Sequence, residues 1–492
     1  MVSASSENRS RWIALVVLCL GSLMIVLDST IVNVALPSIK RDLGFTQTSL
    51  AWIVNGYLLT FGGFLLLGGR LGDLLGRRRM FLGGIALYTL ASLACGAAQS
   101  QGTLVAARVI QGFGGAVVSA VALSLMVSLF VEPAERAKAM GVFGFVAAGG
   151  GTLGVLAGGI LTDLLDWHWI FLVNVPIGIG VCLAALRVLP AEGRAEGEAR
   201  LDITGAVMVT AALMLAVYAI VNGNQAGWTS GQTLGLLAGA VVLLAAFVAQ
   251  ESRARTPLVP LGLFRLRNLA TANVVGVLWA GAMFAWFFLS ALYLQLVLGY
   301  SPLGVGLAFL PSNLIMGAFS LGISAKLVMR FGIKPPLAGG LLLAAAGLGL
   351  FARAPVHGHF LLDVLPSMIL LGFGAGIAFN PVLLAAMGDV EPSESGLASG
   401  IVNTSFMMGG ALGLAILASI AASRTSHLLA AGHTPLGSLD AGYHTAFLIG
   451  ALFAILAAGL GALLLRTGST APAFESDSEH GSEPALADAG RP

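Results

Sequence analysis

Asp28 and Arg108 are the two ionisable residues that lie deep inside long apolar stretches of this sequence. Placing such a charge at the centre of a bilayer costs about 2.5 to 3.5 kcal/mol on insertion scales, so a residue kept there is a candidate for function. A buried carboxyl can gain or lose a proton according to its access to water and to nearby cations, whereas arginine stays protonated. We therefore expect Asp28, on the side of an apolar cavity, to carry a proton, and Arg108 to control its release. The alternative is a static ion pair that only fixes helix packing.

Arg108 also begins a stripe of polar and small residues at helical spacing. The stripe lies on one face of the helix and continues through Gln111, Gly112, Gly115 and Ser119. Such a face is expected to look into protein or a cavity and not into lipid.

A second cluster of charge lies between two apolar stretches, in residues 69–79. It is predicted to be a glycine-rich gating loop with one acid among arginines, formed by Gly69, Arg70, Gly72, Asp73, Gly76, Arg77 and Arg78, followed by Arg79. Basic residues alone would be explained by anchoring at a membrane surface. The acid suggests a latch, in which Asp73 pairs with an arginine or with a helix N-terminus in one conformation and not in another.

Two further groups of residues are expected to pack helices or line a pocket. Small residues four apart allow helix backbones to approach closely, and this spacing occurs at Gly150, Gly154 and Gly158, with Gly159 beside them. An apolar pocket with a few polar contacts is typical of small-molecule sites. The candidates for it at membrane depth are Asn55, Gln111, Trp286, Asn380 and Asn403. For any single aromatic, a lipid-facing position is an equal alternative.

The elements that must position these residues are membrane-spanning helices. The chain of 492 residues is 57% hydrophobic and only 10% charged, with a mean hydropathy of +0.92, whereas soluble domains carry about 25% charged residues. A span needs about 20 apolar residues. Fourteen stretches qualify: 12–36, 48–68, 80–99, 103–126, 139–161, 168–189, 203–222, 232–250, 268–298, 303–325, 335–353, 361–386, 396–420 and 441–465.

The distribution of positive charge predicts how these spans are oriented. Lys and Arg concentrate in cytoplasmic loops. With both termini in the cytoplasm, most of the 25 Lys and Arg residues fall on the cytoplasmic side, and only Lys40, Arg41, Arg353 and Arg424 fall outside. We therefore expect a multi-pass protein of the plasma (inner) membrane.

An internal repeat divides the chain into two halves. Adding 256 to the residue number carries Arg70 onto Lys326 and the first five spans onto spans nine to thirteen, a pattern typical of transporters. The predicted organisation is a cytoplasmic N-terminus, a six-helix half, two inserted helices with their connections, a second six-helix half and a disordered cytoplasmic tail. Their bounds are 1–11, 12–189, 190–267, 268–465 and 466–492.

Several other classes of function find no support in the sequence. The net charge is +2 and its basic residues are scattered, so no nucleic-acid partner is expected. The three cysteines lie in apolar stretches without metal-ligand spacing, so we expect no metal site. Paired carboxylates, a His-rich cluster or a nucleophile with its base at depth would indicate an enzyme, and none is evident. A phosphate-binding Gly-rich loop is missing as well, which disfavours direct coupling to ATP.

Taken together, the motifs resemble those of the major facilitator superfamily, in its fourteen-span drug/proton antiporter branch. Residues 27–37 are similar to the first-span signature of that branch, and 69–79 resemble the loop between spans two and three. Residues 104–114 fit the span-four motif, and 167–178 resemble the start of span six. Two positions depart from the branch, since His168 stands where Arg is usual and Val155 replaces the Pro of the span-five antiporter motif.

This resemblance implies an all-α polytopic membrane protein with the major facilitator fold. It implies that Asp28 and Arg108 serve proton coupling and that Asp73 and its arginines serve conformational gating. The expected function is export of small amphipathic drugs or antibiotics, driven by the proton-motive force without a cofactor, by a chain active as a monomer. The alternative is a transporter of the same fold with another cargo or direction, such as a symporter or an exporter of a siderophore, sugar or amino acid.

Overall fold

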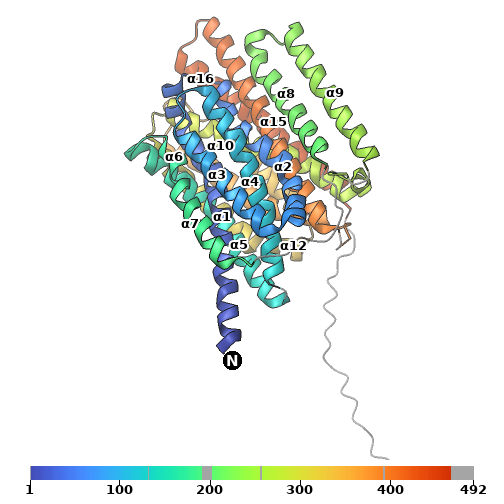
Figure 1. Ribbon diagram of the computed structural model, residues 1–492. Helices are drawn as coiled ribbons and strands as arrows, with labels where there is room; N and C mark the ends of the chain where they lie inside the picture. Colours follow the sequence, from blue (N-terminus) through green and yellow to red (C-terminus); the bar gives the residue numbers. More distant parts are fainter. Residues whose placement is uncertain (1, 131, 191–201, 255–256, 392–393, 467–492) are drawn as a thin grey trace, which may run out of the picture.

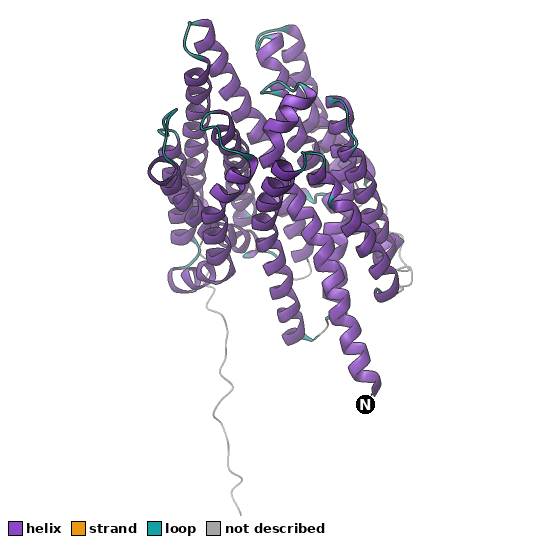
Figure 2. Ribbon diagram, turned by 90° about the vertical axis from the view of Figure 1, so that its left-hand side faces the viewer, coloured by secondary structure: helices purple, strands orange, loops and turns teal. Residues whose placement is uncertain are grey.

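The computed structural model describes residues 2–130, 132–190, 202–254, 257–391 and 394–466. Across these ranges the protein is a bundle of helices with no strand (Figure 2). The predicted C-terminal tail lies outside the described residues except for Arg466. Most of the predicted linker before the inserted helices also lies outside them.

The helices follow the predicted spans closely. The helices that correspond to the predicted spans are α1 (Val2–Leu43), α2 (Trp52–Leu75), α3 (Arg77–Gly96), α4 (Gln101–Leu129), α5 (Pro133–Leu164), α7 (Asn174–Val188), α8 (Ile203–Ala226), α9 (Gly231–Arg253), α10 (Arg267–Leu296), α11 (Pro302–Ala318), α13 (Lys334–Phe351), α14 (Leu365–Met387), α15 (Ser395–Ala430) and α16 (Pro435–Leu464). Short helical segments are η1 (Ser49–Ala51), α6 (Trp169–Leu172), η2 (Leu261–Arg265), η3 (Phe319–Ile323), α12 (Ser324–Phe331) and η4 (Phe360–Val364). Within the described ranges, 13 helical stretches are long and apolar enough to cross a membrane, so the chain is a multi-pass membrane protein.

The predicted tenth span is the one that falls short of this criterion. The sequence predicted a single span over 303–325, whereas α11 ends at Ala318 and continues through a π-helical turn, Phe319–Ile323, into α12. Pro311 lies inside α11. A π-turn changes the helix register and is frequent at functional positions, which sequence periodicity could not reveal.

The predicted gating loop is mostly helix, and that expectation was wrong. Helix α2 continues to Leu75, the chain turns at Gly76 with φ of 94°, and α3 begins at Arg77. Arginine and leucine are good helix formers, so the change from apolar to polar residues marks the membrane surface and not the end of the helix. Only Gly76 needs the left-handed backbone that glycine permits.

The packing of helices repeats between the two halves, as the internal repeat predicts. The pair α1 and α5 packs together as the pair α10 and α15 does, and α3 packs on α4 as α13 does on α14. The halves meet where α5 contacts α11 and where α2 contacts α15. These two seams are related by the same repeat, so each half presents equivalent surfaces to the other.

The inserted helices α8 and α9 lie at one edge of the bundle, on the right in Figure 1. Helix α8 packs against α2 of the first half and α15 of the second. Asn224 donates to the carbonyl of Ser419 at 2.8 Å and to its hydroxyl at 2.9 Å. Helix α9 packs mainly on α8, and its Val241 and Val242 are exposed, as expected for side chains that face lipid.

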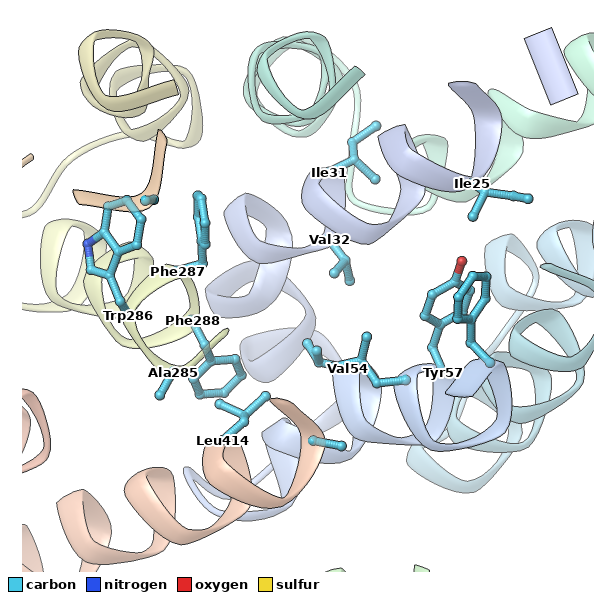
Figure 3. Close-up of a cluster of buried hydrophobic side chains, with 14 of the residues drawn as sticks. Ile25, Ile31, Val32, Val54, Tyr57, Ala285, Trp286, Phe287, Phe288 and Leu414 are labelled. Atoms are coloured by element: carbon cyan, nitrogen blue, oxygen red, sulfur yellow. The ribbon is translucent and has the colours of Figure 1, made fainter. Parts of the chain in front are cut away.

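Two ends of the bundle can be distinguished by the turns they carry. The Gly76 end holds the α2–α3 turn, and the Gly44 end holds the connection from α1 to α2. A dry cluster joins the halves in the interior, where Val32, Val54, Phe288 and Leu414 come together from α1, α2, α10 and α15 (Figure 3). This packed cluster separates a cavity that opens at one end of the bundle from the opposite end.

Candidate functional site

Asp28 of α1 and Arg108 of α4 form a buried ion pair. Arg108 Nη1 donates to Asp28 Oδ2, and the two side chains are 1% and 0% exposed, respectively. The structure therefore brings together the two residues that were singled out in the sequence, although they lie 80 positions apart in the chain. Breaking a buried pair by removing one partner leaves an uncompensated charge, so this contact is costly to open unless the carboxyl is neutralised.

Two amide side chains complete the surroundings of the carboxylate. Asp28 Oδ1 accepts from Gln111 Nε2 at 3.0 Å and from Asn174 Nδ2 of α7 at 3.3 Å. Arg108 in turn donates from Nη1 to Gln111 Oε1 at 2.7 Å and from Nε to the carbonyl of Ile53 at 2.9 Å. Both oxygens of Asp28 thus accept hydrogen bonds from side chains of other helices, α4 and α7.

A further layer fixes the orientation of these groups. Gln111 Nε2 also donates to Ser92 Oγ at 2.8 Å, and Ser92 donates to the carbonyl of Tyr88 at 2.8 Å. The guanidinium carbon of Arg108 lies 4.4 Å from the centre of the Tyr57 ring, a cation–π contact. The polar network is therefore enclosed by protein from α2, α3 and α7 as well as α1 and α4.

Sequence reasoning did not single out Asn174, Ser92 or Tyr57 as members of this network. Asn174 was part of the span-six stretch, and an amide at membrane depth could have marked it as a candidate. Ser92 and Tyr57 carry no comparable signal, because a hydroxyl inside an apolar helix usually bonds its own backbone. Their role becomes visible only through the packing of α2 and α3 on α4.

A cavity of about 710 Å³ lies between the halves and reaches the Gly76 end. Helix α1 contributes Ser22, Ile25, Val26 and Ser29 to its wall, but Asp28 is not in the lining, contrary to expectation, because it faces α4. The remaining wall is largely apolar and includes Tyr57, Leu58, Phe61, Leu65, Leu66, Leu123, Phe143, Phe284 and Met407. Among the described residues of the lining, only Arg70 and Asp73 are charged, and both belong to the Gly76 end.

Of the five pocket residues expected from the sequence, Asn403 alone lines this cavity. Asn55, Gln111 and Trp286 are buried elsewhere, with 0 to 1% of each exposed. Asn380 instead donates to the carbonyl of Ser320, in the π-helical turn, at 2.6 Å. Polarity at depth identified two buried amides, Asn55 and Gln111, but it could not distinguish a cavity wall from a helix contact.

Three of the seven predicted gating residues lie at the mouth of the cavity. Gly69, Arg70 and Asp73 line it, and Arg77 donates from Nη2 to Asp73 Oδ1 at 3.2 Å, four positions along the chain. Arg70 Nη2 donates to the carbonyl of Pro257 at 2.8 Å, and Arg78 to the carbonyl of Leu186. The segment is thereby tied both to the connection that follows α9 and to α7.

Glycines hold neighbouring helices close to this site. A Cβ at Gly72 would lie 2.8 Å from Val121 Cγ2, and one at Gly112 would lie 2.2 Å from Thr60 Oγ1. A Cβ at Gly76 would be strained by the positive φ already described. The α2–α4 contact thus depends on small residues on both helices.

The predicted glycine stripe of α5 faces two different helices. Cβ atoms at Gly150, Gly154 and Gly158 would meet α1 at Leu23, Leu27 or Ile31, whereas one at Gly159 would lie 2.9 Å from Leu303 Cα of α11. Backbone approach of this closeness leaves no space for larger side chains. The first three glycines therefore pack within one half, and Gly159 packs across the seam between halves.

The Gly44 end is closed by contacts between the halves. Gln295 Nε2 of α10 donates to the carbonyl of Val34 in α1 at 2.7 Å. A Cβ at Gly306 of α11 would lie 3.0 Å from the carbonyl of Val155 in α5. The cavity is consequently open at one end and blocked at the other. No group of three or more His, Cys, Asp or Glu suited to a metal occurs in the part of the chain that the structure describes.

Comparison with known proteins places this architecture in a family. The chain matches the Major Facilitator Superfamily over residues 18–414. It is 40% identical over 450 residues to the puromycin resistance protein pur8 of Streptomyces alboniger, covering 90% of this chain and 89% of that protein. It is 39% identical to the cephamycin export protein CmcT of Amycolatopsis lactamdurans, covering 86% and 87%. It is 37% identical to the multidrug resistance protein Stp of Mycobacterium tuberculosis, covering 86% and 78%.

Solved structures share the fold at low identity. An auto-inhibited peptide transporter of the POT family superposes with a TM-score of 0.68 at 16% identity, covering 94% of this chain and 98% of that one. A bacterial homologue of the lysosomal transporter Spinster, inward-facing and unoccupied, gives 0.65 at 15% identity, covering 92% and 97%. The chain belongs to the Major Facilitator Superfamily and is a membrane transporter, not an enzyme.

Proposed function

We propose that this protein exports small amphipathic drugs or antibiotics in exchange for protons, by alternating access. The observation that carries the proposal is the buried Asp28, bonded to Arg108, Gln111 and Asn174 on one side of α1 while Ser29 lines the cavity on the other. A change in the charge of Asp28 would therefore act on the same helix that contacts the substrate. The names of three relatives, which describe puromycin resistance, cephamycin export and multidrug resistance, support the cargo class.

The proton acts by exchanging partners around Asp28. Protonation removes the charge that Arg108 neutralises, so the α1–α4 contact loses its electrostatic attraction and the helices are free to separate. Arg108 keeps its bonds to Gln111 and to the carbonyl of Ile53, which spares it from being left unpaired. Release of the proton to the other side restores the pair. One charge moving through a membrane potential of 100 mV supplies about 2.3 kcal/mol.

The cavity suits an apolar or amphipathic cargo. Its wall offers aromatic and aliphatic side chains with the polar groups of Ser22, Ser29, Tyr57 and Asn403, and its charges are confined to the mouth. A cargo binds such a wall through the apolar surface that it buries there. The wall can therefore accept molecules of many shapes, as promiscuous binding sites do. A cationic cargo is permitted but not required.

We also propose an orientation in the membrane and a functional unit for this chain. The Gly76 end carries the arginines that the positive-inside rule assigns to the cytoplasm, so we place both termini there, in the plasma membrane. The cavity then faces the cytoplasm, the side from which an exporter loads. The protein works as a monomer, because each half supplies one wall of the same cavity, and the proton-motive force replaces any cofactor.

Everted membrane vesicles from cells that express the chain test the proposal. Adding puromycin or a cationic dye to acid-loaded vesicles should release protons in the wild type and in Asp163→Asn, an exposed carboxyl on α5. Asp28→Asn, which has nearly the same shape, should abolish the release and the drug resistance of the cells. Unchanged resistance in Asp28→Asn would contradict proton coupling, and proton uptake with substrate would indicate a symporter.

A further inference from the structure

Asp202 and Glu251 bring two carboxyl groups together at the Gly76 end of the inserted helices. Asp202 caps the start of α8, and Glu251 lies in the last turn of α9. They are 8% and 3% exposed. The sequence assigned them to two separate inner connections, so their meeting is a product of the α8–α9 hairpin.

Within the described ranges, each carboxyl group has one oxygen that accepts a hydrogen bond and one that does not. Asp202 Oδ1 accepts from the amide of Gly205 at 2.8 Å, and Glu251 Oε2 accepts from the amide of Val259 at 3.0 Å. Asp202 Oδ2 and Glu251 Oε1 have no hydrogen-bond partner among the described residues. These two oxygens converge beside Gly205, where a Cβ would lie 2.5 Å from Oε1 and 2.9 Å from Oδ2.

Two acceptor oxygens that face each other in a buried site need a proton between them. Like charges at short range disfavour the doubly ionised state, and one carboxyl of such a pair retains its proton. A single proton turns the two unsatisfied acceptors into one donor and one acceptor. A metal ion fits less well, because the other oxygens are already approached by amide N–H groups and the described residues supply no third acidic, His or Cys ligand.

Among the described residues, no side chain forms an ion pair with either carboxyl group. The packed surface is apolar, formed by Leu67 and Leu71 of α2 with Ala206 and Leu258. On the described helices that pack around the pair, the other charged side chains are Arg253, exposed on α9, and Arg70 and Asp73 of α2. Arg70 bonds the carbonyl of Pro257, and Asp73 pairs with Arg77.

We propose that Asp202 and Glu251 form a second proton-binding site, in which one proton is shared between the two carboxyl groups. The site is linked to the mouth of the cavity through residues 257–259, since Val259 bonds Glu251 and Pro257 bonds Arg70. Loss of the proton drives the carboxylates apart and pulls on this segment, and with it on Arg70. Proton binding is independent of the export proposed above, whereas its effect on the cavity rests on that function.

Infrared spectroscopy of the purified full chain tests the site directly. At about pH 7, where ordinary carboxyls are ionised, the wild type should show the carbonyl stretch of a protonated carboxyl. Asp202→Asn and Glu251→Gln should each remove the same band, because the remaining carboxyl then accepts from an amide and ionises. The double variant should remove no more than either single one. Asp163→Asn should leave the band unchanged.

Three results would overturn the proposal. They are the absence of any protonated-carboxyl band in the wild type, a band that both single variants retain, and a band that only one of them removes. The first needs no variant, so misfolding of Asp202→Asn or Glu251→Gln cannot hide it. Asp28→Asn keeps the pair intact, so failure of proton coupling at Asp28 and failure of the shared proton are separate outcomes.

Discussion

The ring of Tyr57 lies between the central cavity and the guanidinium of Arg108, lining the first and covering the second at 4.4 Å. The aromatic face stabilises the cation, by about 2 kcal/mol where water is excluded. The Asp28 carboxylate that Arg108 binds is fully buried behind it. Tyr57 thus separates the cavity from the ion pair.

Removing that partition should uncouple the transporter. In Tyr57→Ala, water from the cavity reaches the ion pair, and we expect protons to cross several-fold faster in the absence of drug. Tyr57→Phe keeps the ring and should behave as the wild type. The measurement is the rate at which a pH gradient collapses across proteoliposomes. Equal rates for the two variants would show that the ring does not separate the sites.

The contact of α5 with α1 should be intolerant of a single methyl group. A Cβ at Gly154 would lie 2.0 Å from Thr30 Oγ1 and 2.7 Å from the carbonyl of Leu27, whereas one at Gly144 would meet nothing within 4 Å. Overpacking costs about 1 to 3 kcal/mol, so Gly154→Ala should lower the thermal stability of the protein in detergent. Gly144→Ala should leave it equal or raise it slightly through helix propensity. Equal melting temperatures would mean that α1 and α5 can move apart freely.

The sequence predicted the fold well because the bilayer imposes simple rules on composition and length. Apolar stretches of sufficient length located the helices, and the repeat located the packing shared by α1–α5 and α10–α15. The break between α6 and α7 within the predicted span 168–189 was missed. So was the π-helical turn, since neither changes the average hydropathy.

The candidate site was predictable only where burial of charge is costly. Asp28 and Arg108 stood out because ionisable groups at depth are rare, and the structure joins them. Asn403 and Asn380 looked alike in sequence, yet one lines the cavity and the other bonds Ser320. The direction in which a polar side chain points depends on helix rotation, which one sequence without a structure does not specify.

The two asparagines therefore make a matched pair for substrate recognition. Asn403→Ala removes an amide from the cavity wall and should change resistance to some drugs more than to others, typically by about tenfold where a hydrogen bond is lost. Asn380 lies outside the cavity wall, so Asn380→Ala should change resistance to all drugs by the same factor or leave it unchanged. Susceptibility panels on both variants at equal expression provide the comparison. A uniform effect of Asn403→Ala would place recognition elsewhere.

The pair of Asp73 and Arg77 should matter for transport more than for stability. Asp73 is 59% exposed, and exposed ion pairs contribute about 0.2 to 1 kcal/mol. Asp73→Asn should therefore leave thermal stability almost unchanged while slowing drug-driven proton release. Glu132→Gln, an exposed acid at the start of α5, provides the control. If both variants transport at the wild-type rate, Asp73 is a surface charge without a gating role.

Gln295 should act as a latch for the closed Gly44 end. Its bond to the carbonyl of Val34 joins the two halves directly, and it must break when that end opens. A hydrogen bond of this kind contributes about 0.5 to 1.5 kcal/mol, so Gln295→Leu should increase the population open at the Gly44 end by about 2- to 12-fold. Distances between spin labels on α1 and α10 at that end would report the shift. Because drug binding to the cavity favours the state closed at the Gly44 end, the same variant should also bind drug more weakly, and unchanged distances with weakened binding would assign Gln295 to substrate contact instead.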